Sequence, residues 1–218
     1  MSRRHIQPQG SEPVPFYNNL LFWAPLTEDG LDNIGNKFGT KTGTVLFSQD
    51  GAYLNESFLT YSFTQSEALS AKTFYVEIKP VATLDTYDYM FSFGTVINNG
   101  QYYRAAICRK TSGMYLYTTL SYSNNRYDKD VSLNVSFPNN SYTKVAMVFN
   151  PTSQVIYKDG TQVWSNSGTD TFTAWSQYNL DLIIGGSPMK LLNRDCRAYI
   201  RDFRIYNIAL TASEVAQL

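Results

Sequence analysis

The chain has 218 residues, of which 43% are apolar, 15% are aromatic and 17% are charged, and its acidic and basic side chains balance at a net charge of zero. This length suits one large β domain, and the aromatic excess favours strands over helices. The balance excludes the basic surface typical of nucleic-acid-binding proteins, and no apolar run is long enough to span a bilayer. A composition rich in tyrosine and asparagine favours protein or carbohydrate partners.

Residues 1–19 are expected to form an N-terminal arm. Arg3, Arg4 and His5 precede a stretch with several prolines, and no apolar segment follows that would make a secretory signal peptide. Such an arm becomes ordered when it lies on its own domain, on another subunit or on a larger assembly. We therefore expect Arg3, Arg4 and His5 to dock on partner subunits. The chain then acts in a cytoplasm, as a mature fragment, or in a virus particle that is released by lysis.

From residue 20 onward, short strand-like segments recur at spacings of roughly 8 to 15 residues, with almost no helical periodicity. They cover 20–26, 44–47, 51–54, 59–63, 74–79, 88–94, 102–108, 114–121, 142–149, 155–163, 180–184 and 198–206. Asn98-Asn99-Gly100 is a hairpin signal, and Asp159-Gly160 predicts a type I′ turn. The pattern predicts one all-β domain over residues 20–218, a sandwich or a barrel.

The last segments predict how the chain closes its sheet. Ile200 and Phe203 should both point inward although they are three residues apart, which predicts a β-bulge at Arg201-Asp202. A capping box and a hydrophobic staple then predict a short C-terminal helix. The capping residues are Thr211 and Glu214, and the staple residues are Leu210 and Val215.

Several segments also carry short motifs in a recognisable order. They are LFWAPL at 21–26, DNIGN at 32–36, DGAYL at 50–54, FYVEIKP at 74–80, VIYKDG at 155–160, LIIGG at 182–186 and IRDFRIYN at 200–207. This order resembles the laminin G-like branch of the concanavalin A-like lectin/glucanase superfamily. The chain departs from the pattern at Ile34, where serine is usual, and in the 74–80 motif, which lacks a tryptophan.

The resemblance implies a two-sheet antiparallel jelly-roll sandwich with one concave sheet. Laminin G-like members are mostly binding modules, and some carry Ca²⁺ at the rim of the sandwich. In this chain Asp32, the carbonyl group of Asn36, and Asp202 on the predicted bulge are candidate Ca²⁺ ligands, because Ca²⁺ prefers several oxygen donors. In the alternative interpretation, Asp32 only shapes its turn and Asp202 pairs with a neighbouring arginine.

The sequence does not favour an enzyme. Glucanases of the superfamily use paired carboxylates on a Glu-x-Asp-x-x-Glu strand, and no glutamate here has that spacing. The only histidine is His5 in the arm, which excludes a Ser-His-Asp or Cys-His system within the domain. A glycoside hydrolase is therefore the least favoured function.

Aromatic residues in or near polar loops are candidates for glycan binding. Sugars stack their apolar faces on aromatic rings, while their hydroxyl groups need polar partners. The candidates are Tyr102, Tyr103, Tyr122, Tyr127, Trp175 and Tyr178. The alternative is that most of these side chains cover the faces of the sheets.

These observations predict a non-enzymatic binding protein that is part of a larger assembly, as either a monomer or a homo-oligomer. The favoured function is a capsid-decoration or fibre protein of a virion, such as a bacteriophage, with the arm on the particle and the domain facing host or mucosal glycans. The alternative is an extracellular, lectin-like module of a secreted bacterial protein. Cys108 and Cys196 are left as either a disulfide or two buried thiols.

Overall fold

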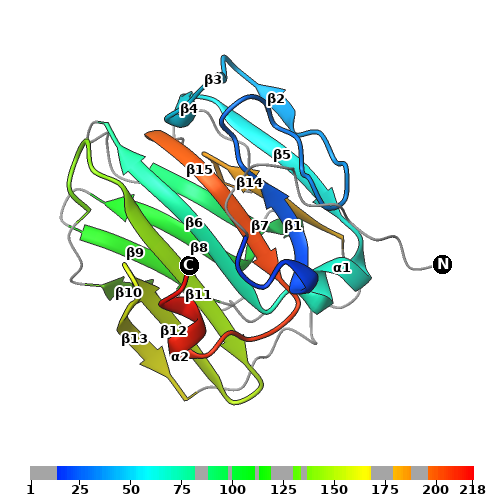
Figure 1. Ribbon diagram of the computed structural model, residues 1–218. Coiled ribbons are helices and arrows are strands. Elements are labelled where there is room, and N and C mark those ends of the chain that lie inside the picture. Colours follow the sequence, from blue (N-terminus) through cyan, green and yellow to red (C-terminus); the bar gives the residue numbers. More distant parts are fainter. Residues whose placement is uncertain are drawn as a thin grey trace.

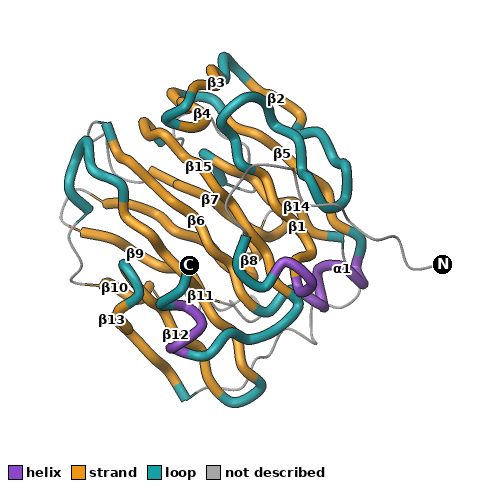
Figure 2. The backbone as a smooth tube through the Cα atoms, viewed as in Figure 1, coloured by secondary structure: helices purple, strands orange, loops and turns teal. Residues whose placement is uncertain are grey.

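The structure, a computed structural model, describes residues 14–81, 88–97, 100–110, 113–118, 130–133, 137–167, 179–187 and 196–218. These residues form two antiparallel sheets that pack face to face (Figure 1). Strands dominate the described part of the chain, and its short helices lie at the periphery (Figure 2). The predicted two-sheet antiparallel sandwich is confirmed.

Sheet A has the strand order β13-β12-β11-β6-β15-β4-β3, and β1 also pairs with β15. Its strands are β1 (Leu20–Ala24), β3 (Leu46–Ser48), β4 (Gly51–Asn55), β6 (Thr73–Pro80), β11 (Thr143–Asn150), β12 (Ser153–Lys158), β13 (Thr161–Asn166) and β15 (Arg197–Tyr206). The closing strand β15 therefore lies in the middle of the sheet, between β6 and the two early strands β4 and β1.

Sheet B has the order β10-β9-β8-β7-β14-β5-β2. Its strands are β2 (Thr40–Thr42), β5 (Phe58–Phe63), β7 (Asp88–Ile97), β8 (Gly100–Lys110), β9 (Gly113–Thr118), β10 (Asp130–Leu133) and β14 (Leu180–Ile184). The short, largely exposed strand β2 was not predicted, because three polar residues carry too little alternation to indicate a strand.

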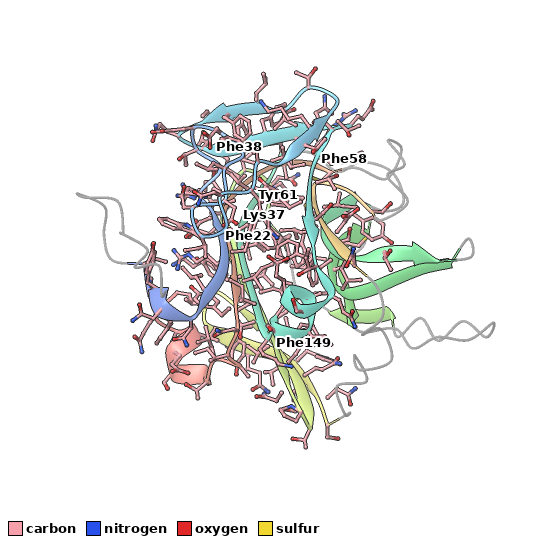
Figure 3. All side chains as sticks on the ribbon, turned by 90° about the vertical axis from the view of Figure 1, so that its right-hand side faces the viewer. Phe22, Lys37, Phe38, Phe58, Tyr61 and Phe149 are labelled. Carbon is pink, nitrogen blue, oxygen red and sulfur yellow. The ribbon has the colours of Figure 1, made fainter. Side chains whose placement is uncertain are left out.

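The core lies between the two sheets and is rich in aromatic rings. Phe203 of β15 meets Phe91 of sheet B at a centroid distance of 4.9 Å and Phe22 of β1 at 6.2 Å. Figure 3 shows the two layers from the side, with Phe22, Tyr61 and Phe149 between them. Edge-to-face contacts of this kind add to the free energy of burying the rings.

The predicted bulge in β15 is confirmed. The register between β15 and β6 shifts between Arg201 and Arg204, and Asp202 has a φ of 52°. The amide of Asp202 turns away from the ladder and donates to the carbonyl group of Pro25 at 3.0 Å. The extra residue lets both Ile200 and Phe203 point into the core, where both are fully buried.

The predicted hairpin at Asp159-Gly160 and the C-terminal helix are also confirmed, whereas Asn98 and Asn99 of the other predicted hairpin lie outside the described residues. Asp159 and Gly160 have φ values of 49° and 76°, as a type I′ turn requires. Helix α2 (Ala212–Val215) has both hydrogen bonds of its capping box, and Leu210 and Val215 are buried on either side of the cap. The 3-10 helix η1 (Tyr17–Asn19) and helix α1 (Gln65–Ser70) were not predicted.

The first described residues pack on the sandwich. Val14 is 7% exposed and belongs, with Tyr206 and Val215, to a second hydrophobic cluster on the outer face of sheet A. The hydroxyl group of Tyr206 donates to the carbonyl oxygen of Pro15 at 3.3 Å. The predicted docking residues Arg3, Arg4 and His5 lie outside the described residues.

Two further observations concern the chain as a whole. Cys108 and Cys196 are buried thiols and do not form a disulfide. Among the residues that the structure describes, no helix has the length and apolar character needed to cross a lipid bilayer.

Candidate functional site

The outer face of sheet A carries rows of side chains that run across its strands. Residues directly opposite one another in an antiparallel sheet share a face. Tyr157, Ala146, Tyr75, Arg204 and Trp23 are successive partners from β12 to β1, and they form the first row. Helix α2 lies against the β11 and β12 end of this row (Figure 1).

The second row lies two residues further along the strands. Lys144 of β11 faces Glu77 of β6, and Glu77 faces Arg201 of β15. Arg201 and Arg204 both point outward although they are three residues apart, because the bulge at Asp202 absorbs one residue. The bulge that lets both Ile200 and Phe203 point into the core therefore also places two arginines on the outer face.

A pocket of about 550 Å³ lies over these two rows. Its floor and sides on the sheet are Tyr75, Glu77, Lys144, Ala146, Tyr157 and Arg201. The end of α2, the Asp159-Gly160 turn and Tyr142 complete its walls. The small side chain of Ala146 creates the hollow, because both of its neighbours in the first row are tyrosines.

A buried carboxylate organises the polar part of the pocket. Glu77 is 8% exposed, and its two oxygens accept hydrogen bonds from the Tyr75 hydroxyl group at 2.9 Å and from Arg201 Nε at 2.7 Å. Burial, and then the charge of Glu77, raise the pKa of Tyr75 well above its usual value, so its hydroxyl group stays protonated. Burial lowers the pKa of Arg201, but the hydrogen bond and charge of Glu77 outweigh it and raise the pKa overall.

The third row continues from the pocket across the sheet, and we call Tyr142, Lys79, Tyr199 and Tyr53 the tyrosine row. Lys79 Nζ lies 5.0 Å from the ring centroid of Tyr142 and 4.4 Å from that of Tyr199. The rings of Tyr199 and Tyr53 are 4.9 Å apart, and all three tyrosines are half-buried. Burial is the main cause that raises the pKa of Tyr142 to about 12.

The candidate Ca²⁺ ligand Asp32 shapes its own loop. It is fully buried, and Oδ1 accepts the amides of Trp23 at 2.9 Å and Ile34 at 3.0 Å, while Oδ2 accepts the amide of Gly35 at 2.8 Å. Burial raises the pKa of Asp32, and the three amides oppose that shift. Asn36 lies in the same loop with a φ of 53°.

Asp202 lies on the other side of the same tryptophan. Its Oδ1 accepts hydrogen bonds from the indole N–H of Trp23 at 3.0 Å and from Nε of Arg204 at 2.7 Å. Its Oδ2 accepts a hydrogen bond from Nη2 of Arg204. Trp23 thus donates to both Asp32 and Asp202. These are the contacts that the alternative interpretation expects. No group of three or more aspartate, glutamate, histidine or cysteine side chains gathers as for a metal in the described ranges, so Ca²⁺ binding stays a prediction.

Most of the predicted glycan-binding residues lie outside the part of the chain that the structure describes. Tyr102 and Tyr103 lie in β8, opposite Thr95 and Gly94 of β7, but their side chains are not among those described. Tyr122, Tyr127, Trp175 and Tyr178 lie outside the described residues. The sheet A tyrosines were not predicted as a site. The alternation in 74–79 shows that Tyr75, Glu77 and Lys79 share a face, but it does not show which strands flank them.

Comparisons with known proteins agree with this architecture. A laminin G-type family model, described as the concanavalin A-like lectin/glucanases superfamily, matches residues 56–216. No curated protein sequence matched the chain.

Among solved structures, Trypanosoma rangeli sialidase in complex with 2,3-difluoro-KDN superposes with a TM-score of 0.71 at 12% identity, over 91% of this chain and 32% of the sialidase chain. Another structure of that sialidase gives 0.69 at 12% identity, over 97% and 34%. Domain 4 of AbnA, an extracellular arabinanase from Geobacillus stearothermophilus solved with arabinotriose, gives 0.65 at 22% identity, over 91% and 97%.

The chain spans about a third of the length of the sialidases that it resembles. Superpositions at identities this low show a shared fold, and they do not show a shared function, because the function of each protein depends on its own site. The fold, the order of its strands and the match over residues 56–216 lead to one conclusion: the chain belongs to the concanavalin A-like lectin/glucanases superfamily.

Proposed function

We propose that this protein is a non-enzymatic binding module that recognises glycans on the outer face of sheet A. The observation that carries this proposal is the pocket of about 550 Å³, in which tyrosine rings stand beside hydrogen-bonding groups. Its volume falls within the range of roughly 300 to 1,000 Å³ that is usual for small-molecule sites. Rings stack on the apolar faces of sugars, and polar groups satisfy sugar hydroxyls.

The carboxylates of the pocket support a binding role. Both oxygens of Glu77 are engaged, by Tyr75 and Arg201. Asp159 accepts the amide of Lys144 at 2.9 Å through Oδ1 and pairs with Lys158 at 3.1 Å through Oδ2. Glycoside hydrolysis needs one carboxylate as an acid and another as a nucleophile or base, whereas these two are held as hydrogen-bond acceptors.

A glycan array probed with the full chain tests this proposal. Ala146→Leu fills the floor of the pocket and should lower the array signal at least tenfold, with thermal melting as the check on folding. Lys144→Ala, at an exposed position of the pocket wall, is the second variant if Ala146→Leu does not fold. Phe38→Ala is the control, because Phe38 is 69% exposed and does not line the pocket. A wild-type chain that binds no glycan, or pocket variants that bind as it does, would contradict the proposal.

We also propose that the module is displayed on a larger assembly, as a capsid-decoration or fibre protein of a virion. Support comes from Val14 and Pro15 of the arm, which contact the outer face of sheet A. Deletion of residues 1–13 spares these contacts and should abolish incorporation into purified particles, with thermal melting as the check on folding. Deletion of residues 1–19 would be less informative, because it also removes Val14 from its cluster. Particles that still contain the shortened chain would refute the anchoring role.

The second candidate is a carbohydrate-binding module of a secreted bacterial protein. It is supported by the similarity in fold to domain 4 of AbnA, which the chain covers almost completely. Arabinotriose is therefore a first probe on the array. Detection of the chain in culture supernatant, and not in particles, would favour this candidate over the virion.

Ca²⁺ binding by Asp32, Asn36 and Asp202 is proposed only as a stabilising feature of either candidate. Removal of Ca²⁺ with EDTA should lower the melting temperature if these oxygens hold the ion, because a ligand that binds the folded state stabilises it. An unchanged melting temperature would leave Asp32 and Asp202 with only their hydrogen bonds to protein groups.

A further inference from the structure

We infer that the ligand is a neutral, linear oligosaccharide held by one end, with its terminal unit in the pocket and its next units over the tyrosine row. This inference rests on the proposed function, because it names the class of glycan and its direction. It draws on three observations, which are the continuity of the two features, the closed far wall of the pocket and the pairing of its charges.

The pocket and the tyrosine row form one continuous surface. Tyr142 lines the pocket and is also the first member of the row, and the guanidinium carbon of Arg201 lies 3.8 Å from its ring centroid. Beyond Tyr142 the row continues with Lys79 and Tyr199. An oligosaccharide whose first unit enters the pocket can therefore lay its following units over the half-exposed rings of the tyrosine row.

The opposite wall of the pocket is closed by the end of α2. A β-carbon added at Gly160 would lie 3.5 Å from the Cα of Ala216, so the turn between β12 and β13 lies beside the helix end with room for about one methyl group between them. On the same side, Lys144 Nζ donates to the main-chain oxygen of Leu218 at 2.8 Å, and the Tyr75 hydroxyl oxygen lies 3.2 Å from that oxygen. An oligosaccharide cannot continue through this wall, and its terminal unit must be the one in the pocket.

Two of the cations along the path, Arg201 and Lys79, already have carboxylate partners. Arg201 pairs with Glu77 at 2.7 Å, and Lys79 pairs with Asp50 at 3.0 Å. An acidic sugar would have to compete with these carboxylates and would place its charge beside Glu77, which is buried in the same wall. A neutral sugar can use the remaining donors and acceptors without breaking an ion pair.

The test measures binding of gluco-, xylo-, manno- and arabino-oligosaccharides of one to four units, together with their uronic-acid counterparts, by array and calorimetry. We expect the four-unit ligand of the recognised series to bind at least tenfold more tightly than its single unit, a gain of about 1.4 kcal/mol, because its added units lie on the rings of the tyrosine row. We expect its uronic-acid counterpart to bind more weakly. We also expect binding to be abolished when the oligosaccharide is coupled to the support through the end that enters the pocket, and to be kept when it is coupled through the other end.

Two variants separate the pocket from the row. Tyr199→Ala should remove the gain with chain length and leave binding of the single unit unchanged, whereas Ala146→Leu should weaken both. Phe38→Ala should change neither. If no glycan binds, the proposed function itself fails. If a glycan binds but its affinity is independent of length, of Tyr199 and of the attached end, or if the acidic counterpart is preferred, the proposed function stands and this inference is overturned.

Discussion

At the scale of single residues, Trp23 joins two acidic residues that the sequence singled out. Its amide donates to Asp32, nine residues away, and its indole donates to Asp202, 179 residues away. The sequence identified both aspartates and the bulge that aims Asp202. It could not identify Trp23 as their shared partner, because a contact over such a separation depends on which strand pairs with β15.

Replacing Asp202 should show how much this network stabilises the fold. Asp202→Ala leaves the nearly buried guanidinium group of Arg204 without its counter-ion, and the free energy of unfolding in urea should fall by about 3 kcal/mol. Asp202→Asn keeps an acceptor and tolerates the positive φ, so its loss should be clearly smaller. Equal losses for the two variants would show that the acceptor kept by asparagine contributes nothing and that the lost charge accounts for the whole effect.

At the scale of elements, α1 and α2 begin with the same signal, but only α2 was predicted. Thr64 and Glu67 form a complete capping box at α1, as Thr211 and Glu214 do at α2. The α2 signal was recognised because apolar residues flank it on both sides. In α1 only Ala68 is buried, and the segment lies between two strong strands, so its pattern looks like a loop.

The capping box of α2 gives a prediction at this scale. Thr211→Ala should lower the free energy of unfolding by about 1 kcal/mol, because the hydroxyl group of Thr211 accepts from the amide of Glu214. Ser213→Ala, in the same turn, removes only an exposed contact of 3.2 Å between the hydroxyl groups of Ser213 and Thr211, so as the control it should change the stability by less than about 0.5 kcal/mol. A Ser213 variant that is as unstable as the Thr211 variant would contradict the capping role.

The same box predicts a pH dependence. The amide and hydroxyl group of Thr211 lower the pKa of Glu214 below its usual 4.5. A lowered pKa in the folded state stabilises the fold above the usual value, and this contribution is lost as the pH falls through the folded-state pKa. In Thr211→Ala the pKa of Glu214, followed by an NMR titration, should rise because the hydroxyl bond is lost. An unchanged pKa would assign the shift to other groups.

At the scale of the whole molecule, stability comes from rings that meet across the two sheets. Phe203 is fully buried against Phe22 and Phe91, so Phe203→Ala leaves a cavity and should lower the free energy of unfolding by about 4 kcal/mol. Phe38→Ala removes the same ring from a 69% exposed position and should change it by less than about 0.5 kcal/mol. Urea unfolding of both variants measures the difference, and similar losses would mean that the exposed ring also contributes to packing.

The sequence by itself determined what depends on neighbouring residues. The alternation of Phe74, Val76 and Ile78, the turn at Asp159-Gly160 and the cap at Thr211 follow from local backbone preferences, so the strands, the hairpin, the helix and the sandwich class were predictable. The spacing of Ile200 and Phe203 even indicated the bulge, because inward positions on a strand recur every second residue.

Only the tertiary structure decided which side chains meet. Tyr75, Ala146 and Tyr157 become neighbours because β6, β11 and β12 are adjacent in sheet A. Arg201 joins them because β15 closes the sheet from the far end of the chain. Strand order is set by how the whole chain buries its apolar faces, and no local pattern encodes it. The pocket and the tyrosine row therefore exist only in the assembled sandwich.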